Sequence, residues 1–158
     1  MAQKFLSNLS TALNQVGLQI VKAMQANLQR NKSNASGNLS KSIESEVVGQ
    51  GDDLRLRITM EPYGEFVDQG RGRSTKGGPR QNWANKIEGW MQYKGITPKG
   101  GLTKKQVAFL ITRKINQKGY KAKPFIQPAV DQIVERDLDG ILGTALAKDV
   151  ETILTKKR

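Results

Sequence analysis

The sequence has 158 residues, 37% of them hydrophobic, and a net charge of +12; this length predicts one domain with a single core. It contains neither cysteine nor histidine, which excludes disulfide frameworks, thiolate metal sites and the usual general base of hydrolytic triads. No apolar run approaches the ~20 residues of a membrane span and the N-terminus lacks a signal-peptide core, so we expect a soluble protein of a reducing cytoplasm.

The first predicted element is an amphipathic helix over residues 3–30. Apolar residues recur there at spacings of three and four, as on one face of a helix: Phe5, Leu6, Leu9, Leu13, Val16, Ile20, Met24 and Leu28. The following "RNKSNASGNLSKS" (30–42) has no such period and is rich in Ser, Asn and Gly. We therefore expect a loop between this helix and the next element.

Residues 42–70 predict a β-hairpin and a third strand. The runs "SIESEVV" and "LRLRITM" alternate apolar and polar residues, and the linking "GQGDD" supplies turn residues. The hairpin should therefore have one buried and one solvated face. The next run, "YGEFVDQG" (63–70), leaves two alternatives, because it suits either an extension of the sheet or a short helical turn.

The positive charge of the protein follows directly after this run. Residues 71–123 hold fourteen basic residues and one acid, whereas residues 1–70 hold seven of each and residues 124–158 hold five basic and six acidic residues. Such segregation indicates a surface that faces phosphate groups or an acidic protein. The segment begins with a glycine-rich basic loop over residues 71–81, which we expect to be flexible and either ordered by a partner or placed in a channel.

Three further helices complete the chain. Two shorter ones are predicted over residues 82–118: the first carries Trp83, Ile87, Trp90 and Met91 on one side, and the second begins at a capping box of Thr103 and Gln106. The last helix covers residues 128–156, with Pro128 near its first position and one apolar face formed by Ile133, Ile141, Ala145 and Ile153. Gly140 and Gly143 in its middle permit close packing on the first helix or a bend.

Together these elements predict one α+β domain over residues 1–158. A small antiparallel sheet is expected to be packed on one face by the long N-terminal and C-terminal helices, with two shorter helices and the basic loop between them. No internal repeat and no second domain is indicated.

No catalytic, cofactor or metal site is predicted. Glu61, Glu65 and Asp68 are close in sequence, but their spacing is irregular and Arg71 and Arg73 are adjacent ion-pair partners. The glycines of the basic loop match no nucleotide-binding fingerprint. Trp83 and Trp90 share a helix face with Ile87, which favours packing over base stacking. We therefore interpret the protein as a non-enzyme.

Two motifs flank the basic segment. "YGEFVDQG" contains Tyr63, Phe66, Val67 and Gly70, and "KPFIQPAV" contains Pro124, Phe125, Pro128 and Ala129 directly before the last helix. With "KIEGWMQYKGI", which includes Trp90, and "AFLITRKINQKG" between them, their order resembles the head–tail joining family of tailed bacteriophages, the neck and tail-completion proteins related to minor tail protein Z. The resemblance spans nearly the whole chain, and the long basic insertion after Gly70 departs from the simplest members.

The resemblance implies a structural virion protein, assembled in the bacterial host cytoplasm. Its copies would form a ring, commonly a hexamer, between the portal-side connector and the tail tube, and DNA would pass through a basic lumen without sequence-specific contacts. In that ring Arg71, Arg73, Lys76 and Arg80 are expected in the lumen or in a docking loop. Phe66 and Phe125 would anchor the fold, and Pro124 and Pro128 would set the angle of the last helix.

Two other functions stay open at this point. The tail terminator, a neighbouring ring that caps the tail tube, would have the same sequence features. A free, non-specific nucleic-acid-binding protein would explain the charge alone. Ring formation separates the first two functions from the third.

Overall fold

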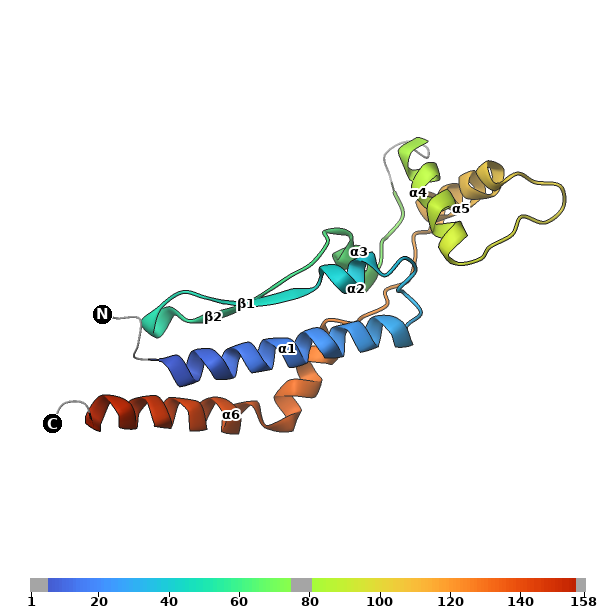
Figure 1. Cartoon of the computed structure of the whole chain (residues 1–158). Helices are drawn as coiled ribbons and strands as arrows, with labels where there is room; N and C mark the ends of the chain where they lie inside the picture. The colour runs from blue at the N-terminus through green and yellow to red at the C-terminus, as the bar shows by residue number, and fades with distance from the viewer. Residues whose placement is uncertain (1–5, 75–80, 156–158) are drawn as a thin grey trace.

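A computed structural model describes residues 6–74 and 81–155, which form a body and a projecting arm (Figure 1). In the body are α1 (Ser7–Arg30), α2 (Asn38–Ser42), β1 (Glu44–Val48), the short 3-10 helix η2 (Gly51–Asp53), β2 (Arg55–Thr59), α3 (Tyr63–Gln69) and α6 (Gln127–Thr155). The arm, residues 81–118, contains α4 (Gln81–Tyr93) and α5 (Lys104–Lys118). The α+β class with long helices at both ends of the chain is confirmed.

The sheet is the predicted hairpin alone. β1 and β2 pair antiparallel, from Glu44 opposite Thr59 to Val48 opposite Arg55, and the sheet has two strands. The prediction of a third strand within residues 42–70 is wrong, because residues 63–69 form the helix α3. Gly64 is buried and Val67 packs against the core. A helix turns residues three apart toward the same side, whereas a strand would point them to opposite faces.

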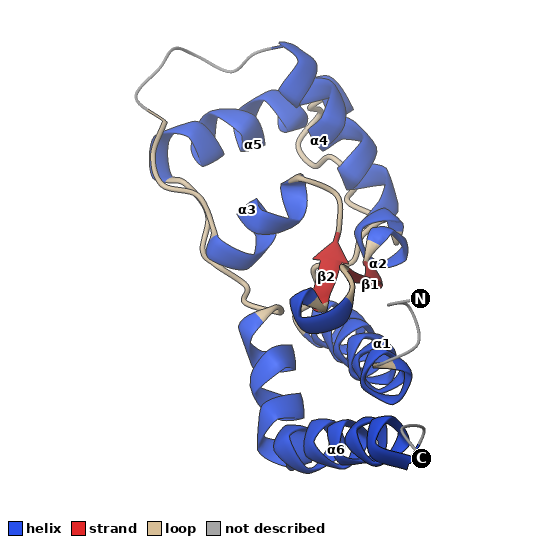
Figure 2. Ribbon diagram, turned by 90° about the vertical axis from the view of Figure 1, so that its left-hand side faces the viewer, coloured by secondary structure: helices blue, strands red, loops and turns tan. Residues whose placement is uncertain are grey.

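The body has three layers, with α1 in the middle (Figures 1 and 2). The hairpin covers one side of α1, and α6 runs along its other side. Gly17 of α1 permits the close approach of the hairpin: a Cβ atom there would lie 2.7 Å from Cδ1 of Leu56 and 2.9 Å from Oγ of Ser45. The layering therefore differs from the expected one, in which both long helices rested on the sheet.

One hydrophobic core joins these layers. It includes the predicted α1 residues Val16, Ile20, Met24 and Leu28, together with Leu39, Ile43, Phe125, Ala129 and Ile133. Phe125 is fully buried in this core, a position that is consistent with the expected anchor of the fold. The core thus connects α1 and α2 with the start of α6.

The helix α6 bends in its first half, so that its later part runs alongside α1 (Figures 1 and 2). Gly140 and Gly143 were expected to permit either close packing on α1 or a bend. Gly143 is not needed for close packing, because a Cβ atom there would meet nothing within 4 Å. Glycine in a helix interior lowers helix stability and is a frequent residue at bends. Close packing against α1 is therefore not the role of Gly143.

Asp149 of α6 caps the start of α1. The residue before α1, Leu6, provides no side-chain cap, and Asp149 is only 2% exposed. Its Oδ1 accepts hydrogen bonds from the backbone N and Nδ2 of Asn8 (3.1 and 2.9 Å), and its Oδ2 accepts one from the backbone N of Leu9 (2.8 Å). A carboxylate at this position satisfies helix-terminal amide groups and matches the positive end of the helix dipole.

These contacts set the pKa of Asp149. Burial by itself would raise this pKa, but the hydrogen bonds from the backbone of Leu9 and from the backbone and side chain of Asn8 outweigh burial and lower the pKa. The ionised form of Asp149 is therefore the one that the fold stabilises.

We predict that Asp149→Ala lowers the free energy of unfolding by about 2–3 kcal/mol, because two amide groups of α1 lose a charged acceptor. Urea titration followed by circular dichroism measures this loss. Asp139→Ala, at an exposed position of the same helix, is the control and should change the value by less than about 0.5 kcal/mol. Equal losses in the two variants would contradict the capping role.

The same contact predicts a pH dependence. Because the pKa of folded Asp149 lies below its ordinary value of 3.8, the stabilisation is fully present above that value and is lost as the pH falls through the lowered pKa. The difference in unfolding free energy between the wild type and Asp149→Asn should therefore be constant above about pH 5 and shrink on acidification. A difference that grows on acidification would exclude this assignment.

Candidate assembly surfaces

The arm is a helical hairpin beside the C-terminal end of α1 (Figure 1). Its α4 and α5 pack against each other, and its buried side chains are few among those described: Met91, Ala108 and Thr112. The predicted capping box of α5 is present, since Gln106 N donates to Thr103 Oγ1 (3.3 Å) and Thr103 N donates to Gln106 Oε1 (2.8 Å). The arm has well-formed helices but only a small core.

Two paired chain segments, residues 70–74 and 119–123, form a stalk between body and arm. Arg71 N donates to Tyr120 O (3.1 Å), Tyr120 N donates to Arg71 O (2.9 Å), and Ser74 N donates to Asn116 O (2.9 Å). Gly119 has a φ of +71°, and a Cβ atom there would collide with Arg71 O. The basic loop expected from residue 71 therefore begins as a paired segment.

The stalk enters the body at a junction of Val67 and Asp68 with residues 123–126. Lys123 N donates to Val67 O (3.0 Å). Asp68 Oδ1 accepts from the backbone N of Phe125 (2.7 Å) and of Ile126 (2.9 Å), directly before α6 begins. The start of α6 is thus capped by a carboxylate from α3.

The C-terminal end of α1 holds the junction from another side. The buried Asn27 donates through Nδ2 to Phe125 O (3.3 Å), and Asn31 Nδ2 donates to Pro124 O (2.9 Å). Lys123 Nζ donates to Asn31 O (3.1 Å). The two motifs that flank the basic segment therefore meet in space.

Most of the motif residues have structural positions at or near this junction. Val67 packs on the core, Gly70 has a φ of +75° with Ala122 N 2.5 Å from its ideal Cβ position, and Tyr63 begins α3. Pro128 is the second residue of α6, as expected, and both it and Pro124 are exposed.

Phe66 corrects an expectation. It is 52% exposed and does not anchor the fold. Because α3 turns Gly64 and Val67 toward the body, the intervening Phe66 points away from it.

The predicted basic residues are only partly placed. Arg71 is half-buried at the start of the stalk, and Arg73 is exposed. Lys76 and Arg80 lie outside the described residues. Trp83 is part of α4, but its side chain is outside the described set.

The acidic residues Glu61, Glu65 and Asp68 do not act as a group. Glu61 and Glu65 are exposed, while Asp68 binds backbone amide groups. Within residues 6–74 and 81–155, no group of three or more acidic side chains is arranged to hold a metal ion. The capping role of Asp149 was not predicted, although its spacing of four from Ala145 and Ile153 places an acid within a predicted apolar face.

Five large apolar side chains of the arm are exposed. We call them together the arm face; they are Trp90, Tyr93, Leu102, Phe109 and Leu110, which are 38–65% exposed. Basic residues flank it at helical spacing: Lys86 precedes Trp90 by four residues, and Lys105 and Arg113 lie four residues before and after Phe109. Trp90 is thus at the surface of the arm, where an apolar patch indicates contact with another molecule.

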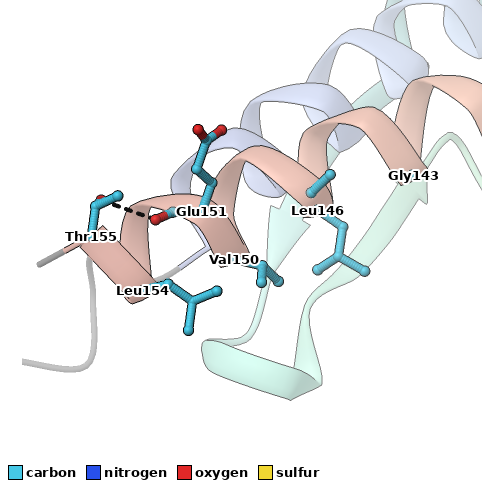
Figure 3. A pocket seen from close by; sticks show the side chains of 7 residues that line it. Gly143, Leu146, Val150, Glu151, Leu154 and Thr155 are labelled. Atoms are coloured by element: carbon cyan, nitrogen blue, oxygen red, sulfur yellow. Dashed lines mark hydrogen bonds between the residues drawn. The ribbon is translucent and has the colours of Figure 1, made fainter. Parts of the chain in front are cut away.

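A second exposed apolar surface lies on the later part of α6. Gly143, Leu146, Ala147, Val150, Glu151, Leu154 and Thr155 line a shallow open hollow (Figure 3). Leu146, Val150 and Leu154 are 45–66% exposed and point outward from the helix. We call this surface the helix face.

None of the described helices combines the length and the apolar content needed to cross a bilayer. No family model matches the chain, and no curated protein or solved structure is found to be similar to it. The function must therefore be argued from the residues and the geometry of this protein itself.

We predict that Gly119→Ala opens the stalk. Gly101→Ala is a matched control, because Gly101 has a similar φ of +74° but a Cβ atom there would meet nothing within 4 Å. Both variants have the cost of an alanine at positive φ, about 1–3 kcal/mol, and only Gly119→Ala also collides with Arg71 O. Hydrogen exchange at the amides of Arg71 and Tyr120 should rise by more than tenfold in Gly119→Ala alone. Equal exchange in both variants would contradict the assigned packing.

Proposed function

We propose that this protein is a structural subunit of the neck of a tailed bacteriophage, where identical copies form a ring that joins the portal-side connector to the tail tube. DNA passes through the ring, and the basic segment lines that passage or contacts the adjoining ring. The protein acts by assembly and catalyses no reaction.

The charge distribution carries this proposal. Residues 1–70 and 124–158 together contain twelve basic and thirteen acidic residues, whereas residues 71–123 contain fourteen basic residues and one acid. The structure separates these two groups in space, because the arm projects from the body (Figure 1). Positive charge without a base-reading element supports contact with phosphate groups that is independent of DNA sequence.

The motif resemblance supports the same function. The two segments with the clearest likeness, residues 63–70 and 123–130, meet at the junction through Val67, Asp68 and Phe125.

The exposed apolar surfaces favour an assembled protein over a monomer. Both the arm face and the helix face present exposed apolar side chains, and those of the helix face line one hollow; exposed apolar patches are typical of protein–protein contacts. A tail-terminator ring would share these features. A free nucleic-acid binder would use the basic arm but gives no role to the helix face.

The test combines particle size with DNA binding. We expect negative-stain images and light scattering of the concentrated protein to show rings. Neutralising Arg73, Lys76 and Arg80 to Gln should leave the unfolding midpoint unchanged and lower the slope of log affinity against log salt for duplex DNA by up to about 3. Arg71 is kept in this variant because it is half-buried in the stalk.

The control neutralises three exposed bases of the body, Lys22, Arg30 and Lys41. It removes the same charge and should leave the salt dependence close to that of the wild type. A monomer that binds duplex DNA tightly would support the free nucleic-acid binder and contradict the ring. Equal effects of the two triple variants would contradict a specific role of the basic segment.

A further inference from the structure

One side of the helix α5 is exposed over three successive turns. The helix packs against α4, and its residues Ala108 and Thr112 are buried. On the other side, pairs of exposed residues recur every four positions: Lys105 and Gln106, Phe109 and Leu110, Arg113 and Lys114. Residues four apart are neighbours on a helix surface, so these residues form one continuous stripe, about 14 Å long. We call it the α5 stripe.

The α5 stripe lies on a helix with positive charge and no negative charge. α5 contains no acid, and its five basic residues are all exposed: Lys104, Lys105, Arg113, Lys114 and Lys118. The salt bridges found among the described residues lie in the hairpin, where Arg55 pairs with Asp53 and Arg57 with Glu46. Glu88, the acid within residues 71–123, is half-buried in α4. The described residues therefore provide no carboxylate that pairs with the cations of α5.

The composition of the α5 stripe favours a phosphate backbone over a protein partner. Lysine is depleted in protein–protein interfaces, whereas lysine, arginine and glutamine side chains make many of the contacts to phosphate groups. Duplex DNA carries one negative charge per about 1.7 Å of its axis, so a stripe of this length faces several phosphate groups. Phe109 and Leu110 lie between the cations and would be covered by the same partner.

We propose that the α5 stripe contacts the sugar–phosphate backbone of duplex DNA, with Lys105 at one end of the contact and Arg113 and Lys114 at the other. The contact is independent of base sequence, because phosphate groups carry no sequence information. This inference rests on the proposed function and deepens it, since it assigns to one helix a DNA contact that the proposed function gives to the whole basic segment.

The test neutralises the three cations of the α5 stripe together. The stripe variant carries Lys105→Gln, Arg113→Gln and Lys114→Gln; these positions are exposed, so its unfolding midpoint should equal that of the wild type. The matched control changes three exposed bases of the same segment that lie outside α5 to glutamine: Lys86, Lys99 and Lys121. Fluorescence anisotropy measures the affinity for a short duplex between about 50 and 200 mM salt.

We expect the two variants to differ in their salt dependence. The slope of log affinity against log salt should fall by about 2–3 in the stripe variant, because each lost phosphate contact lowers it by about 0.9. In the control variant the slope should fall by less than about 1. The two variants lose the same net charge, so a difference between them reports the place of the contact.

A second measurement locates the DNA without removing charge. The chain contains no cysteine, so a single introduced thiol can carry a photoreactive maleimide label. Gln106→Cys places this label on the α5 stripe, and Gln19→Cys places it on an exposed position of α1. Irradiation should attach duplex DNA to the first variant at least about tenfold more than to the second, because the phosphate contact holds the duplex at α5.

The other outcomes overturn the inference. Equal slopes in the stripe and control variants would show a diffuse attraction of the whole basic segment. Equal DNA attachment at Gln106→Cys and Gln19→Cys would exclude a located contact. A wild type that binds no duplex DNA, but binds vesicles of anionic lipid through the stripe cations, would assign the stripe to a membrane surface.

Negative-stain images of the same samples test the proposed function separately. Rings together with any of these contrary results would refute the role of the α5 stripe and leave the proposed ring intact. Monomers that bind duplex DNA through the stripe would confirm the contact and refute the ring.

Discussion

The structure depends on the contact between α3 and the segment that precedes α6. The chain leaves the body after Asp68 and returns at Phe125, and the carboxylate of Asp68 accepts the backbone amides of Phe125 and Ile126. A helix start has amide groups without intrahelical partners, so this contact fixes where α6 begins. It also places Phe125 in the core and holds both segments of the stalk together. The arm can therefore project from the body with only a small core of its own.

The two long helices are linked by the same kind of contact. Asp149 of α6 caps the start of α1, as Asp68 of α3 caps the start of α6. Each contact joins segments far apart in sequence, by 141 and 57 residues. Buried or half-buried carboxylates thus link α6 to the body near both of its ends, and Asp131, Glu135, Asp139 and Glu151 of that helix are exposed.

The motif residues and the exposed apolar residues are separated in this protein. The motif residues Val67, Gly70 and Phe125 lie at the junction, where they build the fold. Of the motif residues, only Trp90 belongs to the arm face or the helix face. These two surfaces consist mainly of exposed aromatic and aliphatic residues in helices. A fold does not define a function, and here the function we propose resides in the distribution of charge and exposed apolar area.

The features of this fold that depend on neighbouring residues were predictable from the sequence. Helical periodicity predicted α1 and α6, alternation predicted the hairpin, and the capping box of Thr103 and Gln106 predicted the start of α5, because each signal arises within one or two turns of chain. Charge counting also located the basic segment, although not the arm that displays it.

The environment of the side chains in these elements depends on contacts within the folded chain. In the structure residues 63–69 are helical, and α1 lies between the hairpin and α6. Phe66 is exposed, and the carboxylates of Asp68 and Asp149 accept hydrogen bonds from backbone amides. These outcomes depend on contacts between segments distant in sequence. Such contacts leave no local period, because the same residue types would suit a solvated surface equally well.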